Sequence, residues 1–201
     1  MNFPTKLTVF RIGLSVLIIF LLLFPFDAMG IDIPRLFINE AIVINLKYII
    51  AGVLFVIASI TDFFDGYLAR KNNQVTDYGK MLDAIADKVL VDSMLIILSG
   101  AGFIKPIIAV VVIVRDIAVD AFKMSAASHG MVIASIKSGK IKTACLMTGI
   151  GLTLFYNLPF ELWNLKVSDF LLIVSAVLSI ISAVQYYDLT KKVVLKAKKE
   201  K

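Results

Sequence analysis

Four aspartates stand in two closely spaced pairs in the first half of the chain. Asp62 and Asp65 are three residues apart, and Asp83 and Asp87 are four residues apart. Either spacing puts both carboxylates on one face of a helix. If the first helix ends and the next begins on the same side of the molecule, the two faces can meet. Carboxylates brought together repel one another unless a cation neutralises them, and all-oxygen ligands favour a hard ion such as Mg²⁺ or Mn²⁺.

Four carboxylates are more than one Mg²⁺ usually takes from protein, because that ion keeps water and substrate-phosphate ligands. Two metal ions sharing the four fit better, and such a pair commonly clamps a phosphoryl group during its displacement. Gly66 and Ala69 leave room for a bulky ligand, and Arg70 ends the stretch with a guanidinium suited to phosphate. The pattern therefore predicts phosphoryl transfer. Ion pairing of the aspartates with Arg70, Lys80 and Lys88 is the structural alternative. An intramembrane prenyltransferase and a cation-transport path are the functional ones.

The composition indicates where these aspartates work. Of the 201 residues, 59% are hydrophobic and 18% are charged, and the mean hydropathy is +0.90. Soluble globular chains average about 45–50% apolar and ~25% charged residues, so a membrane protein is expected. Uncharged runs cover 12–26, 48–61, 143–160 and 170–187. A bilayer span needs roughly 20 mostly apolar residues, with charges tolerated near its ends.

Extended to their flanks, these runs predict helices near 5–26, 41–68, 143–160 and 168–188. The stretch 80–128 is apolar but interrupted by charges. It divides into two helices where a Gly-rich turn is followed by Lys105 and the helix-starting Pro106. The predicted fold class is an all-α membrane protein with six transmembrane helices. Residues 1–190 form the catalytic domain, and 191–201 form a basic cytoplasmic tail.

The basic residues predict the orientation of the six helices. All but four of the 21 Lys and Arg residues fall on the side that holds both termini and the aspartates. The positive-inside rule makes that side cytoplasmic. We therefore expect a multi-pass protein of the cell membrane whose active site faces the cytoplasm, at the ends of the second and third helices. The net charge of +6 then reflects orientation rather than nucleic-acid binding. The tail suits anionic lipid headgroups, or is simply a solvated end.

Eight positions match the signature D-x2-D-G-x2-A-R-x8-G-x3-D-x3-D, so the sequence resembles the CDP-alcohol phosphatidyltransferase family. The matching residues are Asp62, Asp65, Gly66, Ala69, Arg70, Gly79, Asp83 and Asp87. The resemblance implies that the four aspartates hold two metal ions and that Asp87 also deprotonates the acceptor hydroxyl. It implies a CDP-lipid site made of Asp62, Gly66, Ala69, Arg70 and Gly79. It further implies release of CMP, and a homodimer.

Basic residues elsewhere indicate the acceptor. The candidates are Arg115, Lys137, Lys140 and Lys142. Segments 115–121 and 130–143 resemble the bacterial branch of the family that makes phosphatidylglycerophosphate, and a basic cluster suits an anionic acceptor. The predicted reaction transfers phosphatidyl from CDP-diacylglycerol to glycerol 3-phosphate. Inositol phosphate, serine and phosphatidylglycerol stay open as acceptors, and the alternative for the lysines is that they simply follow the positive-inside rule.

Three smaller features complete the prediction. The opening Pro4–Arg11 resembles the P-N-x-[LI]-T-x-x-R start of these enzymes, with Thr5 in place of the usual Asn. Arg115 could pair with Asp116 or Asp120 instead of binding a phosphate. Asp92 stands four residues after Lys88, so an ion pair between these two is expected.

Overall fold

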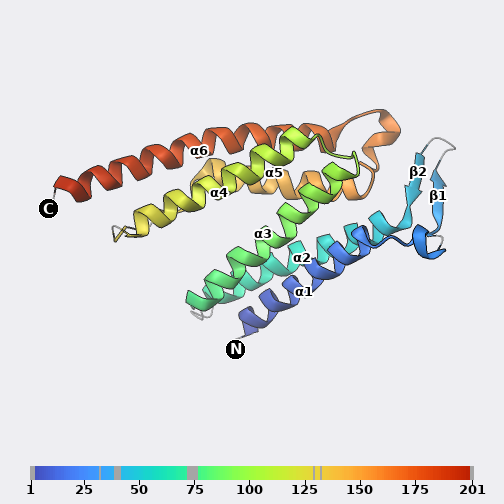
Figure 1. Ribbon diagram of the computed structural model, residues 1–201, viewed down its shortest axis with the longest axis horizontal. Helices are drawn as coiled ribbons and strands as arrows, with labels where there is room; N and C mark the ends of the chain where they lie inside the picture. The colour runs from blue at the N-terminus through green and yellow to red at the C-terminus, as the bar shows by residue number, and fades with distance from the viewer. Residues whose placement is uncertain are drawn as a thin grey trace.

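The computed structural model describes residues 3–31, 33–38, 42–71, 77–128, 130–131 and 133–199. Within these residues the chain forms six long helices and one small hairpin (Figure 1). The helices are α1 (Phe3–Leu23), α2 (Leu46–Lys71), α3 (Asp77–Gly100), α4 (Pro106–Ser128), α5 (Lys137–Leu154) and α6 (Val167–Lys199). Short 3-10 turns η1 (Asp27–Met29) and η2 (Phe160–Trp163) lie in the connections. The helical fold class predicted from the sequence is confirmed.

A β-hairpin lies between α1 and α2, where the sequence predicted helix from residue 41. Its strands are β1 (Arg35–Ile38) and β2 (Ile42–Asn45), which pair antiparallel. The β-branched run in the second strand favours extended backbone, although its apolar character continues directly into the helix. Helix α2 begins only after Asn45, whose side-chain oxygen accepts a hydrogen bond from the Lys47 amide at 3.1 Å. This cap separates strand from helix.

The six helices pack as two groups of three. Helix α1 packs against α2 and α3, and α6 packs against α4 and α5. Contacts of α2 with α5 and of α3 with α4 join the groups into one bundle. Ile18, Phe55, Leu90 and Leu146, from four different helices, are buried in a shared apolar core. The core thus holds together helices that carry charged residues near their ends.

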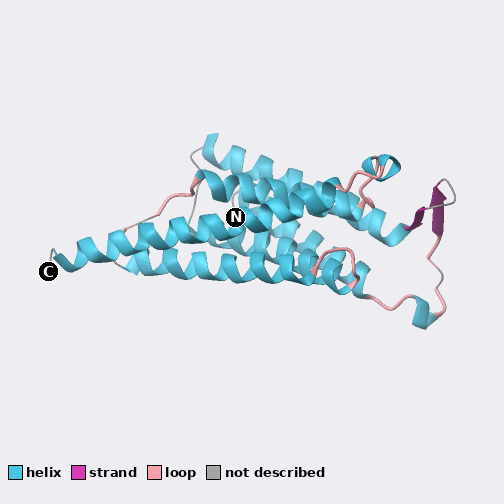
Figure 2. Ribbon diagram, turned by 90° about the horizontal axis from the view of Figure 1, so that it is seen from above, coloured by secondary structure: helices cyan, strands magenta, loops and turns pink. Residues whose placement is uncertain are grey.

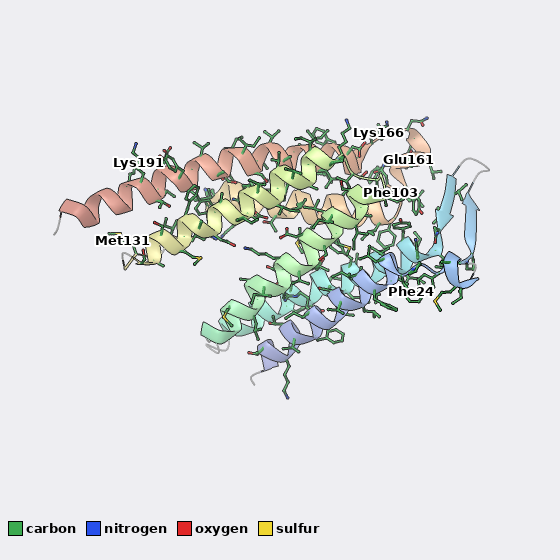
Figure 3. The ribbon with its side chains drawn as sticks, viewed as in Figure 1. Phe24, Phe103, Met131, Glu161, Lys166 and Lys191 are labelled. Carbon is green, nitrogen blue, oxygen red and sulfur yellow. The ribbon has the colours of Figure 1, made fainter. Side chains whose placement is uncertain are left out.

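The two ends of the bundle differ in what they contain. Phe24, Phe103, Glu161 and Lys166 lie at one end, and Met131 and Lys191 lie toward the other (Figure 3). The hairpin and the connections after α3 and α5 share the first end, whereas the start of α1 and the ends of α2, α4 and α6 lie toward the second (Figures 1 and 2). Successive helices therefore run in alternate directions along the bundle.

Two of the described helices, α1 and α6, are long and apolar enough to cross a bilayer, over Thr5–Leu23 and Val167–Lys192. Large apolar side chains also project outward, and Phe20, Val114 and Val177 are each more than half exposed. Soluble proteins rarely carry apolar surface on this scale. The chain is a membrane protein. The predicted tail is part of helix α6, which continues to Lys199. At 1.5 Å per residue this helix is about 50 Å long.

Candidate active site

Three of the four predicted metal ligands come together where α2 and α3 approach each other. Asp62 lies near the end of α2, and Asp83 and Asp87 lie near the start of α3. One oxygen from each carboxylate lies within 4.8 Å of the others. Asp83 and Asp87 share one face of α3, as their spacing predicts, and this face meets Asp62 of α2. Asp65 belongs to α2 by its backbone, and its side chain lies outside the described part of the structure.

An arginine from α1 lies at the centre of this carboxylate cluster. The Arg11 Nη1 atom is 2.7 Å from Asp62 Oδ1, 3.0 Å from Asp83 Oδ1 and 2.9 Å from Asp87 Oδ1. Its side chain is 0% exposed. Sequence reasoning did not include Arg11 among the site residues. The signal that could have identified it is the arginine that closes the opening motif, 51 residues before Asp62 in the chain.

The donor atoms of the cluster fit a hard divalent cation. Three carboxylates and one guanidinium leave a formal charge of −2, which one divalent ion would balance. The ligands are all oxygen, as Mg²⁺ and Mn²⁺ prefer. The side chains of Asp83 and Asp87 are 43% and 47% exposed, so the cluster is open to a substrate. Asp62, Asp83 and Asp87 would therefore hold the metal, and its charge would assist chemistry on a phosphate.

The predicted CDP-lipid residues lie on the same two helices. Gly66, Ala69 and Arg70 continue α2 beyond Asp62, and their side-chain surroundings lie outside the described part. Gly79 lies in the first turn of α3 and is partly buried. The backbone therefore carries the predicted donor residues close to the carboxylates. Their contacts with a ligand stay a prediction.

A second charged cluster lies between α4 and α5. Lys142 Nζ donates to both oxygens of Asp116, at 2.9 and 2.7 Å, and Arg115 Nη1 donates to Asp116 Oδ1 at 2.7 Å. Lys142 is only 3% exposed. Arg115 therefore pairs with Asp116, which was one of the alternatives to phosphate binding. Its other guanidinium nitrogens, Nε and Nη2, donate to Ser182 instead. Lys142 is held as one half of a buried ion pair.

The Arg115 guanidinium also contacts α6, next to the start of α5. Its Nη2 donates to Ser182 Oγ at 2.7 Å, and its Cζ lies 5.6 Å from the centre of the Tyr186 ring. The Tyr186 hydroxyl accepts a hydrogen bond from the Ile136 amide, directly before α5. Ile136 provides no side-chain cap, so the free amides of the first turn carry the positive end of the helix dipole.

The predicted acceptor residues thus separate into two groups. Lys137 and Lys140 are exposed in the first turn of α5. Arg115 Nη2 would lie 3.5 Å from a side chain added at Gly139, so the guanidinium adjoins this turn. Helix dipole, two exposed lysines and Arg115 together suit an anion. Lys142 lies one turn further along α5 and is committed to Asp116.

An ion pair between α3 and α4 joins the two clusters. Lys88, next to Asp87 in the chain, pairs with Asp120 on α4. The predicted pair of Lys88 with Asp92 is therefore wrong. Lys88 reaches across to the neighbouring helix instead of along its own, because α3 and α4 pack together there. The contact ties the helix of the carboxylates to the helix of Arg115.

Fold and site together define a helical membrane protein with a carboxylate cluster suited to metal-assisted chemistry on phosphates. The model of the CDP-alcohol phosphatidyltransferase family matches residues 1–184, and the chain belongs to this family. The resemblance inferred from the eight-residue motif is confirmed. The chain is an enzyme of this class.

Several bacterial proteins named CDP-diacylglycerol--glycerol-3-phosphate 3-phosphatidyltransferase are similar along nearly their whole length. The protein from Bacillus subtilis (strain 168) is 37% identical over 186 residues, which are 92% of this chain and 93% of that protein. The protein from Rickettsia bellii is 32% identical over 192 residues, 95% and 96% of the two chains. The one from Haemophilus influenzae is 33% identical over 195 residues, 94% of each.

Proposed function

We propose that the protein transfers the phosphatidyl group of CDP-diacylglycerol to glycerol 3-phosphate, forming phosphatidylglycerophosphate and CMP. The observation that carries this proposal is that a carboxylate cluster and an uncapped, basic helix start lie at the same end of one bundle. The names of relatives that align over nearly the whole chain support the same two substrates. The reaction joins a lipid donor to a small charged acceptor. The carboxylate cluster suits the donor, and the basic start of α5 suits the acceptor.

We propose that the donor binds across α2 with its diphosphate at the carboxylates. Asp62, Asp65, Asp83 and Asp87 would hold two Mg²⁺ or Mn²⁺ ions, which would neutralise the diphosphate when bound. An apolar groove of about 690 Å³ runs between α2 and α5, lined by Phe55, Ile60, Phe64, Met147 and Phe155 among others. Phe55 and Ser59, which both line this groove, precede Asp62 by seven and three residues and so lie on the same side of α2 as Asp62. A diphosphate at Asp62 would therefore leave an acyl chain free to enter this groove.

The acceptor would bind with its phosphate at the start of α5. Arg115, Lys137 and Lys140 supply positive charge there, and the uncapped amides of the first turn add the helix dipole. Lys142 supports this site indirectly, because its ion pair with Asp116 orients the carboxylate that also holds Arg115. An uncharged acceptor would gain little from such a site.

The chemical step needs a base beside the acceptor hydroxyl, and Asp87 is suited to that role. It is the most exposed of the three described carboxylates, and its Oδ1 is the atom that contacts Arg11. Its second oxygen, Oδ2, would take the hydroxyl proton. The acceptor oxygen would form a bond to the β-phosphorus while the bond from that phosphorus to the bridging oxygen breaks. CMP then leaves with the bridging oxygen as part of its phosphate.

We propose that all six helices span the membrane, with the end of the bundle that carries the carboxylates in the cytoplasm. The alternate directions of the helices and the bias of Lys and Arg toward this end support that orientation. Soluble CMP and glycerol 3-phosphate would then reach the site directly from the cytoplasm.

Acceptor substitution with purified protein tests the function. The full chain in mild detergent is supplied with Mg²⁺, CDP-diacylglycerol and one acceptor at a time, and CMP release is measured. We expect release with glycerol 3-phosphate and at most slow release with inositol phosphate, serine or phosphatidylglycerol. Preferred release with one of these three would overturn the acceptor assignment. Ion flux into liposomes without any CDP-lipid would instead support the transport alternative.

A further inference from the structure

We propose that Arg11 is an internal cation that occupies the carboxylate cluster before metal binds and competes with the metal for the same oxygens. The inference rests on the proposed metal site. It assigns Arg11 a positioning role in that site, because the residue acts through the carboxylates rather than on the reacting atoms.

The burial of Arg11 requires partners of opposite charge. It lies within the apolar span Thr5–Leu23 of α1 and is 0% exposed. A cation within such a helix is costly unless an anion accompanies it. Arg11 meets this requirement with three carboxylates from two other helices, all within 3.0 Å of one nitrogen atom. The arginine therefore fastens the start of α1 to the faces of α2 and α3 that form the site.

The contacts of Arg11 are the contacts that a metal ion needs. Nη1 is at nearly equal distance, 2.7 to 3.0 Å, from one oxygen each of Asp62, Asp83 and Asp87. A divalent ion bound by the same three oxygens would lie at about 2.0–2.1 Å from each if it were Mg²⁺. The nitrogen and the ion cannot both lie between the same oxygens. Metal binding must therefore displace the guanidinium from at least one of them.

Electrostatics predicts that removal of Arg11 raises the affinity of the carboxylates for a metal ion. Without Arg11, one oxygen of each of the three carboxylates would lie less than 5 Å from the others, and no other described cation would pair with them. They would then repel each other and bind an added cation more strongly. A neighbouring arginine lowers a carboxylate pKa by about 1–3 units, which is a tenfold or larger effect on binding of a proton. A divalent cation should respond at least as strongly.

The test measures Mn²⁺ binding without substrates. Wild-type protein and Arg11→Met, both in detergent and stripped with EDTA, are titrated with Mn²⁺ while free Mn²⁺ is followed by electron paramagnetic resonance. We expect Arg11→Met to bind Mn²⁺ at least about tenfold more tightly, to unfold at lower temperature without metal, and to gain more in Tm from metal than wild type. Arg11→Gln keeps a donor group but no charge, and should change affinity in the same direction.

Arg115→Met is the matched control, because Arg115 is also a helical arginine that pairs with an aspartate at 2.7 Å. It should leave Mn²⁺ affinity unchanged. Equal or weaker Mn²⁺ affinity in whichever Arg11 variant folds would overturn the inference. An equal loss of Tm with and without metal would do the same, because replacing a purely structural arginine has that effect. Wild-type CMP release is assayed separately. Tighter Mn²⁺ binding without any CMP release would contradict the proposed function and leave the role of Arg11 intact.

Discussion

Replacement of Asp116 by Asn removes the carboxylate that accepts both hydrogen bonds of Lys142. That lysine is 3% exposed, so its ammonium would stay buried while its partner loses its charge. Removing one member of a buried ion pair costs about 3–5 kcal/mol. The Asp116 side chain is 19% exposed, so we expect a loss near the lower limit, about 3 kcal/mol. For a chain of this size that corresponds to a Tm lowered by about 6–12 °C.

Lys142→Met should be milder, because Asp116 would keep its 2.7 Å contact with Arg115. We expect it to cost about 1 kcal/mol. The double variant Asp116→Asn with Lys142→Met no longer buries a lone ammonium, so it should be about 2 kcal/mol more stable than Asp116→Asn alone. Unfolding in mixed micelles of mild detergent and SDS measures all three. An Asp116→Asn protein within about 0.5 kcal/mol of wild type, or no recovery in the double variant, would refute the reasoning.

Three further changes test other parts of the molecule. Asp87→Asn should slow CMP release at least about 100-fold while leaving CDP-lipid binding largely intact; equal loss of both would make Asp87 a metal ligand only. Lys137→Gln should raise KM for glycerol 3-phosphate several-fold, with KM for the lipid donor unchanged, and a rise in both would contradict a site for the acceptor phosphate. Gly149→Ala places a methyl group 3.0 Å from Leu172 side-chain atoms and should lower the free energy of unfolding by about 1–3 kcal/mol. Gly151→Ala, whose nearest neighbour is 4.0 Å away, is the matched control and should change it little.

Local spacing was enough to predict the carboxylate cluster. The i, i+4 separation of Asp83 and Asp87 puts both on one face of α3 wherever that helix packs, and the short link from α2 brings Asp62 to the same end. Likewise Pro106 begins α4 as predicted, because proline suits the first turn of a helix. These features depend on backbone geometry that the sequence encodes within a few residues.

Features that depend on packing between distant segments were missed. Arg11 joins the cluster only because α1 packs against α2 and α3. Helix α5 begins at Lys137 rather than near residue 143, because its polar first turn gains contacts with Arg115 and Tyr186 that hydropathy does not reveal. The hairpin was missed for the opposite reason, since its second strand is as apolar as the helix that follows.

The charged clusters belong to different helix groups, so their separation depends on how the groups are joined. The carboxylates and Arg11 lie on α1–α3, whereas Arg115 and the start of α5 lie on α4–α6. Lys88 follows Asp87 directly, and its partner Asp120 lies just over one turn after Arg115 on α4. Both side chains are about 40% exposed, so the pair adds little stability. Its interest is its place: it lies where α3 and α4 meet, beside the proposed base Asp87 on one helix and close to Arg115 of the proposed phosphate site on the other.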